Sequence, residues 1–242
     1  MPRNRRAERL AGAVVVVVAL CLPGAAATRK QLRAGAYAID ITPPRFPVVV
    51  NGMFFERVAQ QASDRIHARC LVLDDGATRI AIVVVDSCMM PRELIDQAKE
   101  TASKKTGIPV NHMLVSATHT HSAPSAMGVL GTPPDEEYVR YLPGKIAEGI
   151  EVAAQHLAPA RIGWASVEDY EHTHCRRWIY RPDKMLTDPF GVASVRANMH
   201  PGYQNPNAIA PAGPVDPELP VVALKSPEGR PIALLANYSL HY

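Results

Sequence analysis

The chain has 242 residues, of which 47% are hydrophobic and 20% are charged, so it can bury one sizeable core and is not a low-complexity disordered polypeptide. Its formal net charge of +3 arises in the first 27 residues, which hold four of the 26 basic residues and one of the 23 acidic residues. The remaining 22 basic and 22 acidic residues balance, and nothing in the composition indicates a nucleic-acid partner.

Residues 1–27 have the order of features of a secretory signal peptide. An arginine-rich start is followed by an unbroken apolar run at 11–21, then by Pro23-Gly24 and three alanines at 25–27. The apolar run is about half as long as the roughly 20 residues that a membrane-spanning helix needs, which disfavours a retained anchor. We therefore expect a cleaved signal, a mature domain at 28–242 and a secreted or periplasmic protein.

Strand and helix signals are mixed along the rest of the chain. The clearest is a hairpin in which two β-branched-rich runs flank Asp74-Asp75-Gly76. A helix is predicted from Pro91 to Lys105, closed by Gly107. A second helix, at 135–156, is expected to be interrupted by Pro143-Gly144. The predicted strands are 36–41, 48–50, 67–73, 79–85, 112–117, 162–167, 221–225 and 232–240.

This order of elements predicts an α/β fold in which mixed β-sheets are flanked by helices. The proline-rich stretch 198–220 is predicted to be a long irregular loop. The last predicted strand runs into His241-Tyr242 without a closing turn or a polar tail, whereas chain ends usually lie in solvated segments. We therefore expect a domain that is truncated at its carboxyl end.

The stretch 114–124 carries the clearest chemical signal. An apolar strand leads into His119-Thr120-His121 and then into Ser122-Ala123-Pro124. On an extended backbone, residues two apart point the same way, so both imidazoles would face one site. Imidazole is a favoured zinc ligand. From the pattern alone, a structural pair bonded to nearby backbone is an equally good interpretation.

The other histidines give weaker signals. His241 follows the predicted strand 232–240 and could share a metal with His119, although a satisfied core or edge histidine explains it as well. His172 and His174 repeat the spacing within a charged turn and are predicted to be surface residues. The histidines predicted to be structural are His67, His112, His156 and His200. Cys70 and Cys88 lie in apolar runs and are predicted to be buried thiols.

Several segments together resemble the neutral, non-lysosomal ceramidase family. Residues 116–124 (SATHTHSAP) are similar to its zinc-site segment, and residues 40–44 (DITPP) to its mature amino-terminal motif. The other similar segments, in the family's order, are 83–86 (VVVD), Arg176-Arg177, 213–217 (GPVDP) and 237–241 (NYSLH). The resemblance runs from residue 35 to the end of the chain.

The resemblance implies an incomplete ceramidase-like catalytic domain, with zinc bound by His119 and His241. His121 becomes a group beside the metal or the substrate carbonyl, and Arg176 a polar contact for the substrate amide or headgroup. Cys175 stands where the family usually has Asn. The family's Glu and Tyr ligands and its associated serine lie beyond this chain, so zinc is expected to bind weakly to this polypeptide alone.

The implied reaction is zinc-dependent hydrolysis of an N-acyl amide, most simply of ceramide to a sphingoid base and a fatty acid. Zinc would lower the pKa of a bound water from about 15.7 towards 7, and His121 and Arg176 are suitable groups to stabilise the oxyanion. The implied partner is a lipid-like N-acyl amide, met at a membrane surface. One alternative is a non-catalytic secreted binding domain on the same scaffold. A metallo-β-lactamase-like hydrolase is disfavoured, because Ser122-Ala123-Pro124 stands where an acid and a further histidine are expected.

Overall fold

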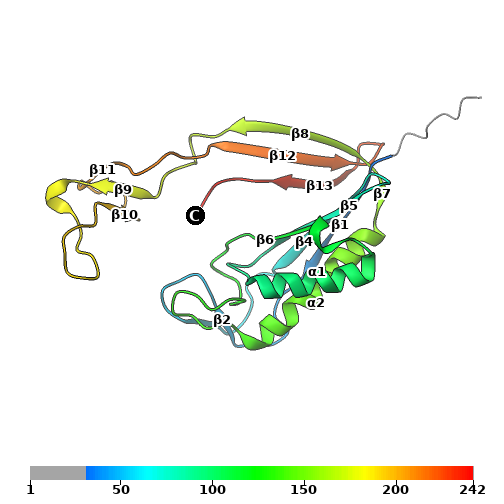
Figure 1. Ribbon diagram of the computed structural model, residues 1–242, viewed down its shortest axis with the longest axis horizontal. Helices are drawn as coiled ribbons and strands as arrows, with labels where there is room; N and C mark the ends of the chain where they lie inside the picture. Colours follow the sequence, from blue (N-terminus) through cyan, green and yellow to red (C-terminus); the bar gives the residue numbers. More distant parts are fainter. Residues whose placement is uncertain (1–30, 242) are drawn as a thin grey trace, which may run out of the picture.

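The computed structural model describes residues 31–241, so the predicted signal peptide lies outside the described residues. The first layer is a five-stranded sheet in the order β6-β5-β4-β1-β7 (Figure 1). Its strands are β1 (Arg33–Asp40), β4 (His67–Asp74), β5 (Arg79–Val85), β6 (Met113–Ala117) and β7 (Ala158–Pro159). β4 and β5 pair antiparallel, which confirms the predicted hairpin. β5 and β6 pair parallel, because a helix carries the chain between them.

Two helices cover one face of this sheet and enclose the main core (Figure 1). α1 (Arg92–Thr106) ends as predicted at Gly107, which has a φ of 71° and donates its N–H to the carbonyl of Ser103. α2 (Glu136–Gln155) begins at Asp135, whose carboxylate accepts from the N–H of Tyr138. The predicted interruption at Pro143 is wrong: the helix continues, since a long apolar face that includes Leu142 and Ile146 is buried against the sheet.

A three-stranded antiparallel sheet forms the second layer, on the side of the first sheet opposite the helices (Figure 1). It consists of β8 (Arg161–Glu168), β12 (Glu218–Lys225) and β13 (Pro231–Ala236), in the order β13-β12-β8. A small cluster that includes Leu71 of β4 and Leu224 of β12 joins the two layers. The predicted strand 232–240 is too long, because the chain leaves the sheet after Ala236.

Short strands complete the fold. β9 (Arg177–Tyr180), β10 (Ala197–Met199) and β11 (Ala208–Pro211) form a sheet at the far end of the molecule from β7 (Figure 1). The expectation of an irregular loop at 198–220 is therefore partly wrong, and Pro211 sits at the end of an edge strand, where a missing N–H is tolerated. The remaining elements are β2 (Val48–Val50), β3 (Arg57–Ala59) and the 3₁₀ turns η1 (Val110–His112) and η2 (Pro182–Lys184).

Over residues 31–241 the architecture is α/β with mixed sheets and two α-helices, as the order of elements predicts. Among residues 31–241, no helix is long and apolar enough to span a membrane.

Candidate metal centre

Three imidazoles from two distant parts of the chain meet in one place. His119 and His121 follow β6 in the first layer, whereas His241 follows β13 in the second. The ring centroids lie 4.9 Å apart for His119 and His121, 5.2 Å for His119 and His241, and 5.1 Å for His121 and His241. The rings line a cavity of about 200 Å³ together with Leu240. The sequence-based expectation that His119 and His241 come together therefore agrees with the geometry, while their roles as ligands stay predictions.

The two histidines after β6 reach this position by a different backbone path from the one expected. β6 ends at Ala117, and His119 has a φ of 63°, in the left-handed region. The pair therefore does not lie on an extended strand. A left-handed conformation costs a residue other than glycine roughly 1–2 kcal/mol, and such residues cluster at functional sites.

Hydrogen bonding fixes which nitrogen of His119 faces the other rings. Its Nδ1 lies 3.0 Å from the carbonyl oxygen of Cys88, and because a carbonyl can only accept, Nδ1 carries the proton. The Nε2 lone pair is then free, and it lies 3.3 Å from Nε2 of His121. In a tetrahedral zinc site with Zn–N distances of about 2.0–2.1 Å, two ligand nitrogens are also about 3.3–3.4 Å apart. The spacing is that of two ligands of one ion, and it also lets His121 donate its Nε2–H to the His119 lone pair when no ion is bound.

A close group of possible metal ligands consists of Cys88, His119 and His121, without His241. Candidate ligand atoms of Cys88, His119 and His121 all lie within 4.8 Å of one another. The Sγ of Cys88, however, lies 3.8 Å from Nδ1 of His119, the nitrogen that donates to the backbone. Burial raises the pKa of the Cys88 thiol and so disfavours the thiolate that binds metals. The contribution of Cys88 to this geometry is its carbonyl, which orients His119.

The turn between β2 and β3 holds His121 in place. Gly52 packs so closely against His121 that an added Cβ would lie 2.5 Å from the Cγ of the histidine. Arg57 donates through one NH2 group to the carbonyl oxygens of both Asn51 and His121. Asn51 is fully buried, and its side-chain amide donates to the carbonyl of Met127 at 2.7 Å. The sequence analysis did not predict a role for these residues at the site.

Burial and nearby positive charge lower the pKa values of His121 and His241 and so favour their neutral forms. The pKa of His121 is lowered first by burial and then by the charges of His119, Arg57 and Arg176. The pKa of His241 is likewise lowered, first by burial and then by Arg176. Neutral imidazole is the form that binds a metal ion. Arg176, predicted to contact the substrate, is therefore close enough to act on both rings.

A larger pocket of about 730 Å³ adjoins His241. Its wall combines Arg176 with aromatic, histidine and polar side chains. His172 and His174 are exposed, as predicted, but they also line this pocket. His200, predicted to be structural, lies with its ring centroid 6.4 Å from that of His241. No sequence signal around His200 indicated this position. His112 and His156 instead face backbone carbonyls in other parts of the molecule.

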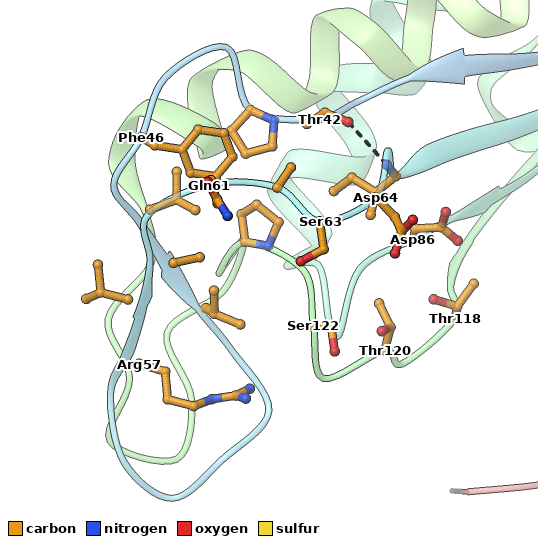
Figure 2. A pocket seen from close by; sticks show the side chains of 18 residues that line it. Thr42, Phe46, Arg57, Gln61, Ser63, Asp64, Asp86, Thr118, Thr120 and Ser122 are labelled. Carbon is orange, nitrogen blue, oxygen red and sulfur yellow. Dashed lines mark hydrogen bonds between the residues drawn. The ribbon is translucent and has the colours of Figure 1, made fainter.

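A second pocket, of about 670 Å³, lies on the other side of the histidine segment. Thr118, Thr120 and Ser122 line it, whereas His119 and His121 do not (Figure 2). Its other wall is largely apolar and includes Phe46 and Val48. Thr118, Thr120 and Ser122 also line the small cavity at the histidines, so the segment 118–122 forms a wall shared by the two cavities.

The likeness to known proteins lies in the fold. No family model matches the chain. Neutral ceramidase from Pseudomonas aeruginosa is similar in structure with a TM-score of 0.60 and 19% sequence identity, over 85% of this chain and 31% of that one. A ceramidase complexed with C2 is similar with a TM-score of 0.55 and 19% identity, over 85% of this chain and 30% of that one. The chain thus spans about a third of the length of these enzymes, and over that part it has the fold of a neutral ceramidase.

Proposed function

We propose that the chain contributes to a zinc-dependent hydrolase of N-acyl amide bonds in lipids, most simply of ceramide. The observation that carries the proposal is the convergence of His119, His121 and His241 on one cavity. The fold supports it, because neutral ceramidase from Pseudomonas aeruginosa is similar in structure over 85% of this chain.

The donor set fits zinc. In this proposal His119 and His241 hold the ion through ring nitrogens. The hydrogen bond from Nδ1 of His119 leaves its Nε2 unprotonated, and the lowered pKa of His241 favours its neutral form. The ion, when bound, supplies a Lewis acid and lowers the pKa of a coordinated water to near 7. A zinc ion usually takes three or four protein ligands, so further groups of the whole protein complete the set.

His121 and Arg176 have the positions and the chemistry to handle the substrate carbonyl. His121 is half-buried and faces both ligand histidines, so its ring can donate a hydrogen bond to an oxyanion beside the metal. Arg176 lines the adjoining pocket together with His241 and brings a permanent positive charge.

The adjoining pocket suits an amphiphilic substrate. Trp178, Tyr203 and Leu240 supply apolar surface, while Arg176 and His200 supply polar contacts near the metal centre. An N-acyl lipid presents a polar amide next to long apolar chains, which matches this division. We propose further that the protein is exported, with residues 1–27 removed, and that it meets its substrate at a membrane surface. Amino-terminal sequencing of the mature protein tests the export.

Hydrolysis of a fluorogenic N-acyl amine in mixed micelles tests the function. The zinc-supplemented protein should release the fluorophore, and His119→Ala should abolish the release. His156→Ala is the control, because the ring of this exposed histidine contacts the Ala36 carbonyl and Tyr37, both outside the site. Undiminished turnover by His119→Ala would refute the proposal. Binding of the N-acyl amine without turnover by the wild-type protein would favour a non-catalytic binding domain.

A further inference from the structure

The segment that carries His241 has little support from the rest of the molecule. β13 ends at Ala236, and strand pairing does not continue through the next five residues. Among residues 236–241 only Tyr238 is not exposed. The backbone N–H of Asn237 still donates to the carbonyl of Pro220, and Ser239 donates to Asp216 at an exposed site. Tyr238 is therefore the main side-chain anchor of this segment.

The partner of Tyr238 is Thr173, in the turn that follows β8. The two hydroxyl oxygens lie 2.8 Å apart. Thr173 Oγ1 also lies 2.8 Å from the carbonyl oxygen of Asp169, which can only accept. The single hydroxyl proton of Thr173 therefore points to the Asp169 carbonyl. The Tyr238 hydroxyl contacts Thr173 and also forms a side-chain hydrogen bond with the Asp169 carboxylate, so both of its partners lie in the same turn. Thr173 is 5% exposed, so water does not readily replace this bond.

The bond joins two segments that carry the residues of the proposed site. Arg176 lies three residues after Thr173, and His241 lies three residues after Tyr238. Within residues 171–177 Thr173 is the one buried residue, just as Tyr238 is the one protected residue of the other segment. Moving either hydroxyl would shift Arg176 relative to His241, and both line the same pocket.

We infer that Thr173 and Tyr238 are positioning residues, whose hydrogen bond sets the location of His241 against His119 and His121 and keeps Arg176 beside it. Neither Thr173 nor Tyr238 is a proposed metal ligand, so each acts through the chain segment that it anchors. The inference rests on the proposed function for its meaning, but the bond and its effect on the His241 ring can be measured without a metal.

Zinc affinity measured by competition with a chromophoric chelator tests the role. Tyr238→Phe and the isosteric Thr173→Val should each weaken zinc binding by about 10-fold or more, the usual effect of losing a group that orients a ligand. Thr173→Ser keeps the hydroxyl and should retain affinity within about twofold of wild type. Ser166→Ala is the matched control, because it removes an exposed side-chain bond to Glu218 elsewhere in the same sheet and should change nothing.

A double-mutant cycle separates positioning from general stabilisation. In a His241→Ala background no ring remains to be placed, so Tyr238→Phe should not weaken zinc binding further. An additional 10-fold loss in that background, or a Tyr238→Phe affinity equal to that of Ser166→Ala, would overturn the inference.

The imidazole NMR signals of His241 in the metal-free protein give a second readout. These signals should move in Tyr238→Phe and Thr173→Val, but not in Thr173→Ser or Ser166→Ala. If the wild-type protein fails to bind zinc while the His241 signals move as expected, the proposed function fails and the positioning role stands. If zinc binds through His119 and His241 while the signals stay unchanged, the positioning role fails alone.

Discussion

Replacing Gly52 by alanine probes the contact that holds His121. Gly52 has a φ of 106°, and its added Cβ would lie 2.5 Å from Cγ and 2.9 Å from Cα of His121. Alanine at positive φ costs roughly 1–2 kcal/mol, and overpacking typically adds about 1–3 kcal/mol. The clash involves the backbone and the inner side-chain atoms of His121, so moving the far end of a flexible side chain cannot relieve it. We expect Gly52→Ala to lower the free energy of unfolding by about 2–5 kcal/mol.

Gly229→Ala is the matched control for backbone strain. Gly229 has a φ of 90° and nothing within 4 Å of its added Cβ, so only the conformational cost of roughly 1–2 kcal/mol applies. Urea unfolding of both variants, followed by circular dichroism, measures the difference, which we attribute to the contact with His121. Zinc affinity should fall in Gly52→Ala alone, because only there is an imidazole displaced. Equal losses of stability, with unchanged zinc affinity in both variants, would refute the role of Gly52.

Two further variants test the scaffold. Asp135→Ala should lower the free energy of unfolding by about 1–2 kcal/mol, because Asp135 both caps α2 and accepts a hydrogen bond from the N–H of Val49. Urea unfolding measures the change, and an unchanged stability would contradict this role of Asp135. The pKa of Asp74 is lowered, first by its hydrogen bond from Arg79. The ion pair therefore stabilises the fold at pH values above the ordinary pKa of an aspartic acid, and this stabilisation is lost as the pH falls through the lowered pKa. The stability difference between wild type and Asp74→Asn should therefore shrink between pH 6 and pH 2, and a difference that grows on acidification would contradict the assignment.

Much of the first layer could be predicted because its signals are local. The β-branched residues 79–85 and the Asp74-Asp75-Gly76 turn fix a hairpin without help from the rest of the chain. Pro143 misled the prediction because tertiary burial of α2 outweighs the lost backbone hydrogen bond. The short strands β9 to β11 were missed because strands of three or four residues among prolines have almost no periodic pattern.

At the candidate site, the sequence predicts which side chains come together but not the backbone contacts that place them. His119 and His241 stood out through their motifs, and the structure brings them together. The left-handed backbone of His119 and the carbonyl contacts of Cys88 and Arg57 could not be predicted, since they depend on main-chain atoms that no residue pattern specifies. The position of His200 likewise depends on how two sheets are arranged in space.

Zinc titration of the purified protein tests the account most directly. His119→Ala and His241→Ala should each weaken zinc binding by at least about 10-fold relative to wild type, whereas His156→Ala should bind zinc as the wild type does. Each variant is compared with the wild type, so the test does not depend on the absolute zinc affinity of the protein. Equal zinc affinity in all three variants would contradict a metal centre shared by the two layers of the fold.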